Sequence, residues 1–146
     1  MSRFVVDSSV VAKWFFVEEH STEAGLLLDS YRGGGCSIIV PDFLYAEVAN
    51  ILWKHHRQRN LDLRFCQAAL DTLRELLLPI FPMTRLLDEA IQLAVQYDRT
   101  VYDMLYVALA DREGCPFITA DERLVNALSV KLPTIVWLGK WTAPTQ

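Results

Sequence analysis

Residues 4–17 read FVVDSSVVAKWFFV, and this stretch passes from the pattern of a strand to the pattern of a helix within a few residues. Phe4–Val6 is an apolar run rich in β-branched residues, which predicts a short buried strand. The apolar residues that follow have helical spacing, so we expect a helix at Ser9–Val17. A strand that leads directly into a helix is the repeating unit of an α/β fold.

The same unit recurs along the rest of the chain. Further strands are predicted at Ser37–Val40, Phe117–Thr119 and Thr134–Leu138, and Pro79–Pro82 allows at most a short edge strand. Helical patterns cover Ser21–Arg32, Asp42–Arg59, Asp62–Leu78, Leu86–Tyr97, Val101–Glu113 and Glu122–Ser129. Strands that alternate with helices favour a parallel sheet covered on both faces. We therefore expect a single three-layer α/β/α domain over residues 1–146, with a short, mostly parallel sheet.

The composition excludes several classes of protein. With 52% hydrophobic and 22% charged residues, the chain is not intrinsically disordered. The net charge of −4 argues against a nucleic-acid binder that works through bulk positive charge, although a local basic patch or a metal-mediated contact stays open. Cys36, Cys66 and Cys115 form no C-x-x-C motif, which is typical of an intracellular protein without disulfides. With no secretory signal and no membrane-spanning apolar run, we expect a cytoplasmic protein.

Two acidic residues follow predicted strands. Asp7 comes directly after Phe4–Val6, and Asp121 comes shortly after Phe117–Thr119. In open parallel sheets ligands bind outside the carboxyl ends of the strands, so both positions suit a binding site. Each aspartate could instead serve only as the N-cap of the helix that follows, because aspartate is among the best N-cap residues.

Two further acids lie on inward-facing sides of predicted helices. Glu47 shares an apolar stripe with Leu44 and Val48, where a carboxylate is costly unless it is paired or bound to a metal. The structural alternative for Glu47 is an ion pair with an arginine from elsewhere in the chain. Asp103 lies on an otherwise apolar face at a helix start, and Thr100, three residues before it, allows a capping interaction instead.

We expect the four acids to converge at one edge of the sheet. Neighbouring carboxylates raise one another's pKa, and a hard divalent cation relieves that repulsion. Ligation by oxygen alone suits Mg²⁺ or Mn²⁺, and the absence of a His/Cys cluster argues against zinc. Such ions activate water and stabilise the leaving oxygen of a phosphodiester. The residues therefore predict a metal-dependent phosphoryl hydrolase, with one ion or two left open.

Four motifs in order resemble those of the PIN-domain nucleases, and within them the VapC-like toxins of toxin–antitoxin pairs. The motifs read VVDSSV (residues 5–10), PDFLYAEVAN (41–50), VYDMLYVALA (101–110) and ITADERL (118–124). Each motif is short and weak by itself. Their order and spacing make the resemblance strong, and it covers nearly the whole chain.

The resemblance implies a Mg²⁺-dependent endoribonuclease that acts as the toxin of such a pair, with Mn²⁺ as the alternative ion. It assigns catalysis and metal binding to Asp7, Glu47, Asp103 and Asp121, with Asp7 and Asp103 as direct ligands of a single bound Mg²⁺. Ser9 and Thr119 would be polar supports that orient these carboxylates.

The same resemblance implies three partners and no membrane. They are an RNA substrate, a cognate antitoxin whose C-terminal segment folds along the toxin, and a second copy of the chain in a homodimer. The apolar run at Trp14–Phe16 and Leu26–Leu28 also favours a subunit interface, because one small core does not need so much apolar surface.

Other functions have weaker support in the sequence. A dehalogenase-type phosphatase needs a second aspartate two positions after the first, and Ser9 stands there. The basic run KHHRQR, residues 54–59, either contacts RNA phosphates or only complements the dipole at a helix end. The alternative that stays open is a metal-binding interaction module with little or no catalytic activity.

Overall fold

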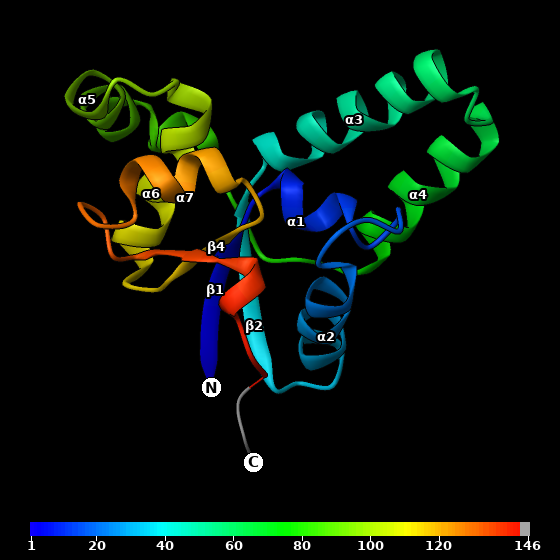
Figure 1. Ribbon diagram of the computed structural model, residues 1–146, viewed down its shortest axis with the longest axis horizontal. Coiled ribbons are helices and arrows are strands. Elements are labelled where there is room, and N and C mark those ends of the chain that lie inside the picture. Colours follow the sequence, from blue (N-terminus) through cyan, green and yellow to red (C-terminus); the bar gives the residue numbers. More distant parts are fainter. Residues whose placement is uncertain (144–146) are drawn as a thin grey trace.

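The computed structural model describes residues 1–143 and arranges them as an α/β protein (Figure 1). Its strands are β1 (Ser2–Val6), β2 (Cys36–Pro41), β3 (Ile80–Phe81), β4 (Phe117–Thr119) and β5 (Ile135–Trp137). Within the described residues they form one sheet in the order β3-β2-β1-β4-β5, and each neighbouring pair is parallel. The predicted α/β class with a parallel sheet is confirmed, and Ile80–Phe81 is the short edge strand that the sequence allowed.

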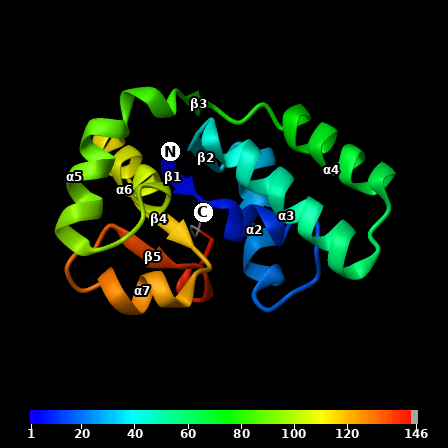
Figure 2. The same cartoon turned by 90° about the horizontal axis from the view of Figure 1, so that it is seen from above.

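Helices cover both faces of the sheet. They are α1 (Ser8–Ala12), α2 (Ser21–Arg32), α3 (Phe43–Arg59), α4 (Leu63–Glu75), α5 (Leu87–Tyr97), α6 (Val101–Glu113) and α7 (Glu122–Leu128), with 3-10 turns η1 (Met83–Arg85) and η2 (Leu138–Lys140). Figure 2 shows α5 and α6 on one side of the sheet and α2, α3 and α4 on the other. α6 packs on β1 and β2, and α2 packs on the opposite face of β2, so the sheet lies between two helical layers.

The core is built around α6. Every residue from Met104 to Ala110 in this helix is buried, as expected for a helix that is apolar on all sides. The helix begins at the N-cap Thr100 and ends at Gly114, whose φ of 62° is a left-handed conformation that glycine adopts at low cost. All three cysteines are free and buried. Among residues 1–143, none of the helices is both long and apolar enough to cross a membrane.

Two predicted helices end three or more residues early in the structure. The helix expected at Ser9–Val17 ends at Ala12, and residues 13–16 form tight turns with backbone hydrogen bonds to residues 10–12. The Trp14 indole donates to the Ala24 carbonyl at 2.9 Å, so tertiary contact with α2 replaces the helix continuation. The helix expected at Asp62–Leu78 ends at Glu75, because Leu77 has a φ of 51° and Pro79 disfavours helical backbone at the residue before it.

Candidate active site

The parallel pairing of β1 and β4 brings Asp7 and Asp121 to the same edge of the sheet. Val6 is in register with Ile118, so the residues after these two strands leave the sheet beside each other. Asp7 caps α1 and Asp121 caps α7, each through its Oδ1 atom, so both N-cap interpretations are correct as far as local structure goes. These caps use the Oδ1 atoms, so the Oδ2 atom of each carboxylate keeps at least one lone pair for another ligand.

Asp7 is the most buried of the candidate acids, with 9% of its surface exposed. Its Oδ1 accepts hydrogen bonds from the Ser9 backbone N–H (3.1 Å) and the Ser9 hydroxyl (2.5 Å), and its Oδ2 accepts from the Thr119 hydroxyl (2.6 Å). Burial raises the pKa of Asp7 to about 6 because the charged form loses its hydration, and the hydrogen bonds from Ser9 and Thr119 oppose that rise only in part. The hydrogen bonds therefore hold this carboxylate in one position, while burial disfavours its charged form.

Ser9 and Thr119 fix Asp7 from two different segments. Besides donating to Asp7, the Ser9 hydroxyl accepts from the Ala120 backbone N–H at 2.9 Å. The Thr119 hydroxyl likewise donates to Asp7 and accepts from the Asp121 backbone N–H at 3.1 Å. Both hydroxyls thus act as donor and acceptor at once, which sets the orientation of the carboxylate and ties the end of β1 to the end of β4.

Glu47 lies in the second turn of α3, between the buried Leu44 and Val48. Its Oε1 accepts a hydrogen bond from the Tyr106 hydroxyl of α6. No lysine or arginine nitrogen lies within 4.0 Å of Glu47 among the described residues, so the proposed arginine ion pair is wrong there. The pKa of Glu47 is raised to about 7, chiefly by burial, with a smaller increase from the charges of Asp7 and Asp103 and a decrease from the Tyr106 hydrogen bond.

Asp103 lies in the first turn of α6, and its backbone N–H donates to the Thr100 hydroxyl at 3.1 Å. The capping interaction is therefore present, but it uses the Asp103 backbone and leaves the carboxylate for other contacts. The Arg99 guanidinium donates to Asp103 Oδ2 at 3.4 Å. Burial raises the pKa of Asp103, Arg99 lowers it, and the charge of Asp121 raises it.

Charge–charge interactions link all four carboxylates. Asp121 raises the pKa of Asp7 and of Asp103, and both of these raise the pKa of Glu47. No three of the four bring one oxygen each within 4.8 Å of one another in residues 1–143. The structure thus brings the four predicted acids near enough to one another for their charges to interact, beside the ends of β1 and β4.

This donor set fits a hard divalent cation. All four groups offer carboxylate oxygens, and two of them, Asp7 and Glu47, have pKa values raised to about 6 and about 7. A cation of charge +2 would favour the ionised form of each, which burial and mutual repulsion disfavour. Oxygen ligands at about 2.0–2.1 Å are what Mg²⁺ selects, and Mn²⁺ accepts the same kind of ligand.

Two residues of the site escaped sequence reasoning. Tyr106 counted as part of the apolar face of its helix, yet its hydroxyl contacts Glu47 across a sequence separation of 59 residues. Arg99 stands one helical turn before Asp103, and this i, i+4 spacing was a signal that could have found it. The Arg99 Nε atom is buried and has no hydrogen-bond partner in the structure.

The Tyr106→Phe substitution should raise the pKa of Glu47 above about 7, because the hydroxyl hydrogen bond opposes the effect of burial. The ring should stay in place, since Tyr106 is 2% exposed and stacks on Phe117 with centroids 5.6 Å apart. Carboxyl-carbon NMR titration of Glu47 measures the shift. Tyr102→Phe is the matched control on the same helix, because Tyr102 is 59% exposed. An unchanged Glu47 titration in Tyr106→Phe would contradict the positioning role.

The chain matches the family model of the PIN domain over residues 4–127. Among curated proteins it is 32% identical to Ribonuclease VapC3 of Pyrobaculum aerophilum over 136 residues, which cover 92% of this chain and 98% of the relative. It is also 32% identical to Ribonuclease VapC1 of Mycobacterium tuberculosis over 124 residues, covering 76% of this chain and 92% of that protein. These relatives match along almost their whole length.

Solved structures resemble the chain in fold. PAE2754 of Pyrobaculum aerophilum superposes with a TM-score of 0.67 at 20% identity, over 94% of this chain and 92% of that one. VapBC2 of Rickettsia felis, solved bound to a DNA fragment from its promoter, gives a TM-score of 0.60 at 14% identity, over 92% and 96%. A toxin–antitoxin complex from Klebsiella pneumoniae gives 0.57 at 18% identity, over 93% and 96%. At these identities the likeness concerns the fold.

Proposed function

The chain belongs to the PIN domain family, and from this premise we propose that it is a Mg²⁺-dependent endoribonuclease that acts as the toxin of a toxin–antitoxin pair. The observation that carries the proposal is the set of four coupled carboxylates at the carboxyl edge of a parallel sheet. Relatives at 32% identity bear the name ribonuclease, which supports RNA as the substrate. Such an enzyme would act in the cytoplasm, where its RNA is.

In this proposal Asp7, Glu47, Asp103 and Asp121 hold the cation, with Asp7 and Asp103 as its direct ligands. A bound divalent ion would lower the pKa of water and stabilise negative charge on the phosphodiester oxygens. Ser9 and Thr119 orient Asp7, and Tyr106 orients Glu47, so that both carboxylates are positioned before the ion arrives. Arg99 pairs with Asp103 and adds a positive charge beside the acids.

The proposed inhibitor is an antitoxin whose C-terminal segment folds along the toxin and places a basic side chain among the acids. Two of the solved structures that share the fold are a toxin–antitoxin complex and VapBC2, which supports a protein partner of this kind. A buried arginine or lysine would relieve the repulsion among the acids much as a cation does. Apolar anchors in a groove between helices would supply the remaining affinity.

We also propose a homodimer, which the exposed face of α5 supports. Leu87, Ile91 and Val95 are spaced four residues apart on this helix and are 41%, 54% and 80% exposed. Trp14, Phe15 and Phe16, by contrast, pack against the core of their own chain, so this apolar run does not need a second subunit. Light scattering should give the mass of a dimer, and Ile91→Glu should reduce it to the mass of a monomer. Gln96→Lys is the control, because Gln96 is exposed on the same helix but lies roughly 140° around its axis from Ile91. A dimer that survives Ile91→Glu would rule out this interface.

The proposed activity predicts a specific response to metal removal. The purified chain, free of any partner, should cleave RNA in the presence of Mg²⁺, lose that activity in a chelator, and regain it when Mg²⁺ or Mn²⁺ is returned. Sequencing of the RNA ends would identify the bond that is cut. Asp103→Asn protein purified in parallel controls for a contaminating nuclease. Cleavage that persists in the chelator would exclude the metal mechanism, and a folded, metal-binding chain without cleavage would favour an interaction module.

A further inference from the structure

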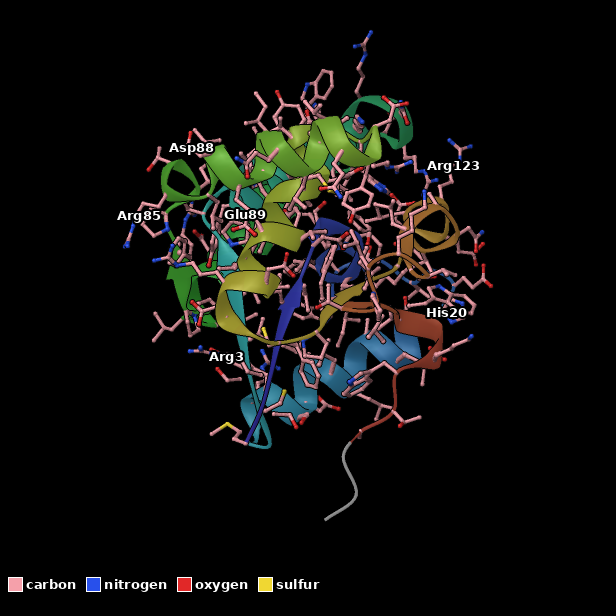
Figure 3. All side chains as sticks on the ribbon, turned by 90° about the vertical axis from the view of Figure 1, so that its left-hand side faces the viewer. Arg3, His20, Arg85, Asp88, Glu89 and Arg123 are labelled. Carbon is pink, nitrogen blue, oxygen red and sulfur yellow. The ribbon has the colours of Figure 1, made fainter. Side chains whose placement is uncertain are left out.

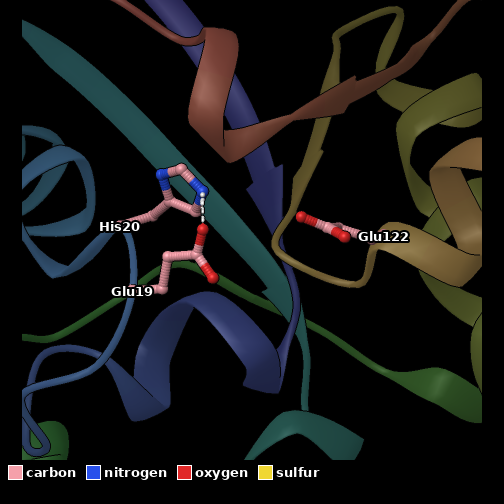
Figure 4. A group of neighbouring side chains, drawn as sticks. All are labelled: Glu19, His20 and Glu122. Atoms are coloured by element: carbon pink, nitrogen blue, oxygen red, sulfur yellow. Dashed lines mark ion pairs between the residues drawn. The ribbon is translucent and has the colours of Figure 1, made fainter.

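Glu19, His20 and Glu122 form a second group of potential metal ligands, separate from the four acids of the candidate active site. Each offers one ligand atom, and the three atoms lie within 4.8 Å of one another. Figure 4 shows that the group joins two distant segments: Glu19 and His20 precede α2, and Glu122 is the first residue of α7. One imidazole nitrogen and two carboxylates differ in chemistry from the all-carboxylate set described above.

The His20 ring lies between the carboxylates of Glu19 and Glu23. Nδ1 lies 3.6 Å from Glu23 Oε1, and Nε2 lies 3.4 Å from Glu19 Oε1. Nε2 is nevertheless buried and makes no hydrogen bond. Neither ring nitrogen forms a hydrogen bond with these carboxylates, and in the tautomer that carries its proton on Nδ1 the Nε2 atom offers a lone pair to a metal ion. A carboxylate on one ring nitrogen and a metal on the other is the usual arrangement of metal-bound histidines.

The surroundings fix the ring in this position. The indole of Trp137 meets it edge-on, with centroids 5.1 Å apart and an interplanar angle of 78°. Gly139 of η2 leaves room for the ring, because a Cβ atom at this position would lie 3.0 Å from His20 Cε1. Figure 3 shows His20 beside η2, with Arg123 of α7 on the same side of the molecule. A ring held by its neighbours loses little freedom when it binds an ion.

We propose that Glu19, His20 and Glu122 bind a divalent transition-metal ion, of the Zn²⁺ or Co²⁺ class, at a site distinct from the hard-cation site. A mixed set of imidazole and carboxylate ligands suits these ions, whereas Mg²⁺ prefers oxygen alone. The ion would tie the segment before α2 to the first turn of α7, whose N-cap is Asp121. This inference does not depend on the proposed ribonuclease activity.

Cobalt is a suitable probe because it is paramagnetic and quenches nearby indole fluorescence. Protein without a histidine tag is titrated with Co²⁺ in a large excess of Mg²⁺, which occupies the hard-cation site. Equilibrium dialysis should show one Co²⁺ bound per chain, and tryptophan fluorescence should fall as it binds. The Trp137→Phe variant should bind Co²⁺ with the same stoichiometry and lose most of the quenching, because the Trp137 indole packs directly against His20.

Substitutions separate this site from the others. His20→Asn removes the imidazole, and asparagine tolerates the left-handed backbone at this position, where φ is 65°. It should weaken Co²⁺ binding at least about tenfold, and Glu122→Gln, which needs no special backbone, should do the same. Two control variants should bind Co²⁺ as the unmodified chain does. They are Asp103→Asn, at the proposed hard-cation site, and His56→Asn, on the exposed end of α3.

Three results would overturn the proposal. The first is the absence of Co²⁺ binding in Mg²⁺, which would identify the group as an ion-pair cluster around a protonated imidazole. The second is unchanged binding in both His20→Asn and Glu122→Gln. The third is the loss of Co²⁺ in Asp103→Asn, which would assign the ion to the acids at the sheet edge. Because the variants are compared by dialysis and fluorescence, a failure of RNA cleavage would not affect the outcome.

Discussion

Asp7→Asn and Asp103→Asn should each lower the rate of RNA cleavage by about a thousandfold or more, while the protein stays folded. Each substitution removes one negative charge from the four coupled carboxylates and keeps the size of the side chain. A catalytic metal ion contributes several kcal/mol to the stabilisation of transition-state charge, and each ~1.4 kcal/mol is a factor of ten in rate. In the proposed metal site both residues are direct ligands, and losing one forfeits most of that contribution because the ion then binds weakly or in the wrong place.

The assay is single-turnover cleavage of RNA by purified protein at saturating Mg²⁺. Circular dichroism and thermal melting establish that each variant is folded. Asp29→Asn is the matched control, because Asp29 is an exposed aspartate on α2, away from the sheet edge that holds the acids. Cleavage by Asp7→Asn or Asp103→Asn at the rate of the control would exclude that residue from the metal site.

Asp7→Asn should also stabilise the metal-free protein, by up to about 3 kcal/mol at about pH 8. The pKa of Asp7 rises from an ordinary value of 3.8 to about 6 in the folded state, chiefly through burial. The folded state therefore holds the Asp7 proton more tightly than the unfolded chain does. As the pH rises from about 4 to about 6, the ionisation of Asp7 lowers the free energy of unfolding, and above about pH 6 the buried charge destabilises the folded state by its full amount.

Asparagine carries no charge, so it avoids this cost, and its carbonyl can still cap α1 by accepting from the Ser9 and Val10 backbone N–H groups. The measurement is urea denaturation in a chelator at about pH 8 and again at about pH 4. The variant should be more stable at the higher pH, and the two proteins should converge at the lower pH, where Asp7 is protonated. Equal stability at both values would show that burial does not penalise the Asp7 charge.

Magnesium should reverse the order of stability at the higher pH. An ion that binds only the folded state stabilises it by mass action, and the unmodified chain keeps all four carboxylates while Asp7→Asn does not. Repeating the denaturation in saturating Mg²⁺ tests this point on the same samples. The two measurements together separate the cost of the buried charge from the gain of the bound ion.

The sequence by itself determined the elements whose signals are local. The predicted Ser21–Arg32 and Val101–Glu113 helices have the same bounds in the structure, and Phe117–Thr119 is likewise the observed β4. For α6 the N-cap Thr100 and the terminal Gly114 lie next to the helix they bound. The candidate acids were also predictable, since each lies just beyond the end of a strand or on the inward face of a helix.

The tertiary structure decided everything that joins distant segments. The helix at Ser9–Val17 stops at Ala12 because Trp14 bonds to α2, and no local pattern records that contact. The sheet order β3-β2-β1-β4-β5 places β1 between β2 and β4, and this order sets which helices become neighbours. Tyr106 therefore contacts Glu47, and His20 lies beside Glu122, although each pair is far apart in the sequence. Periodicity reports which face of an element is buried, but the partner on that face depends on strand order and register, which are properties of the whole chain.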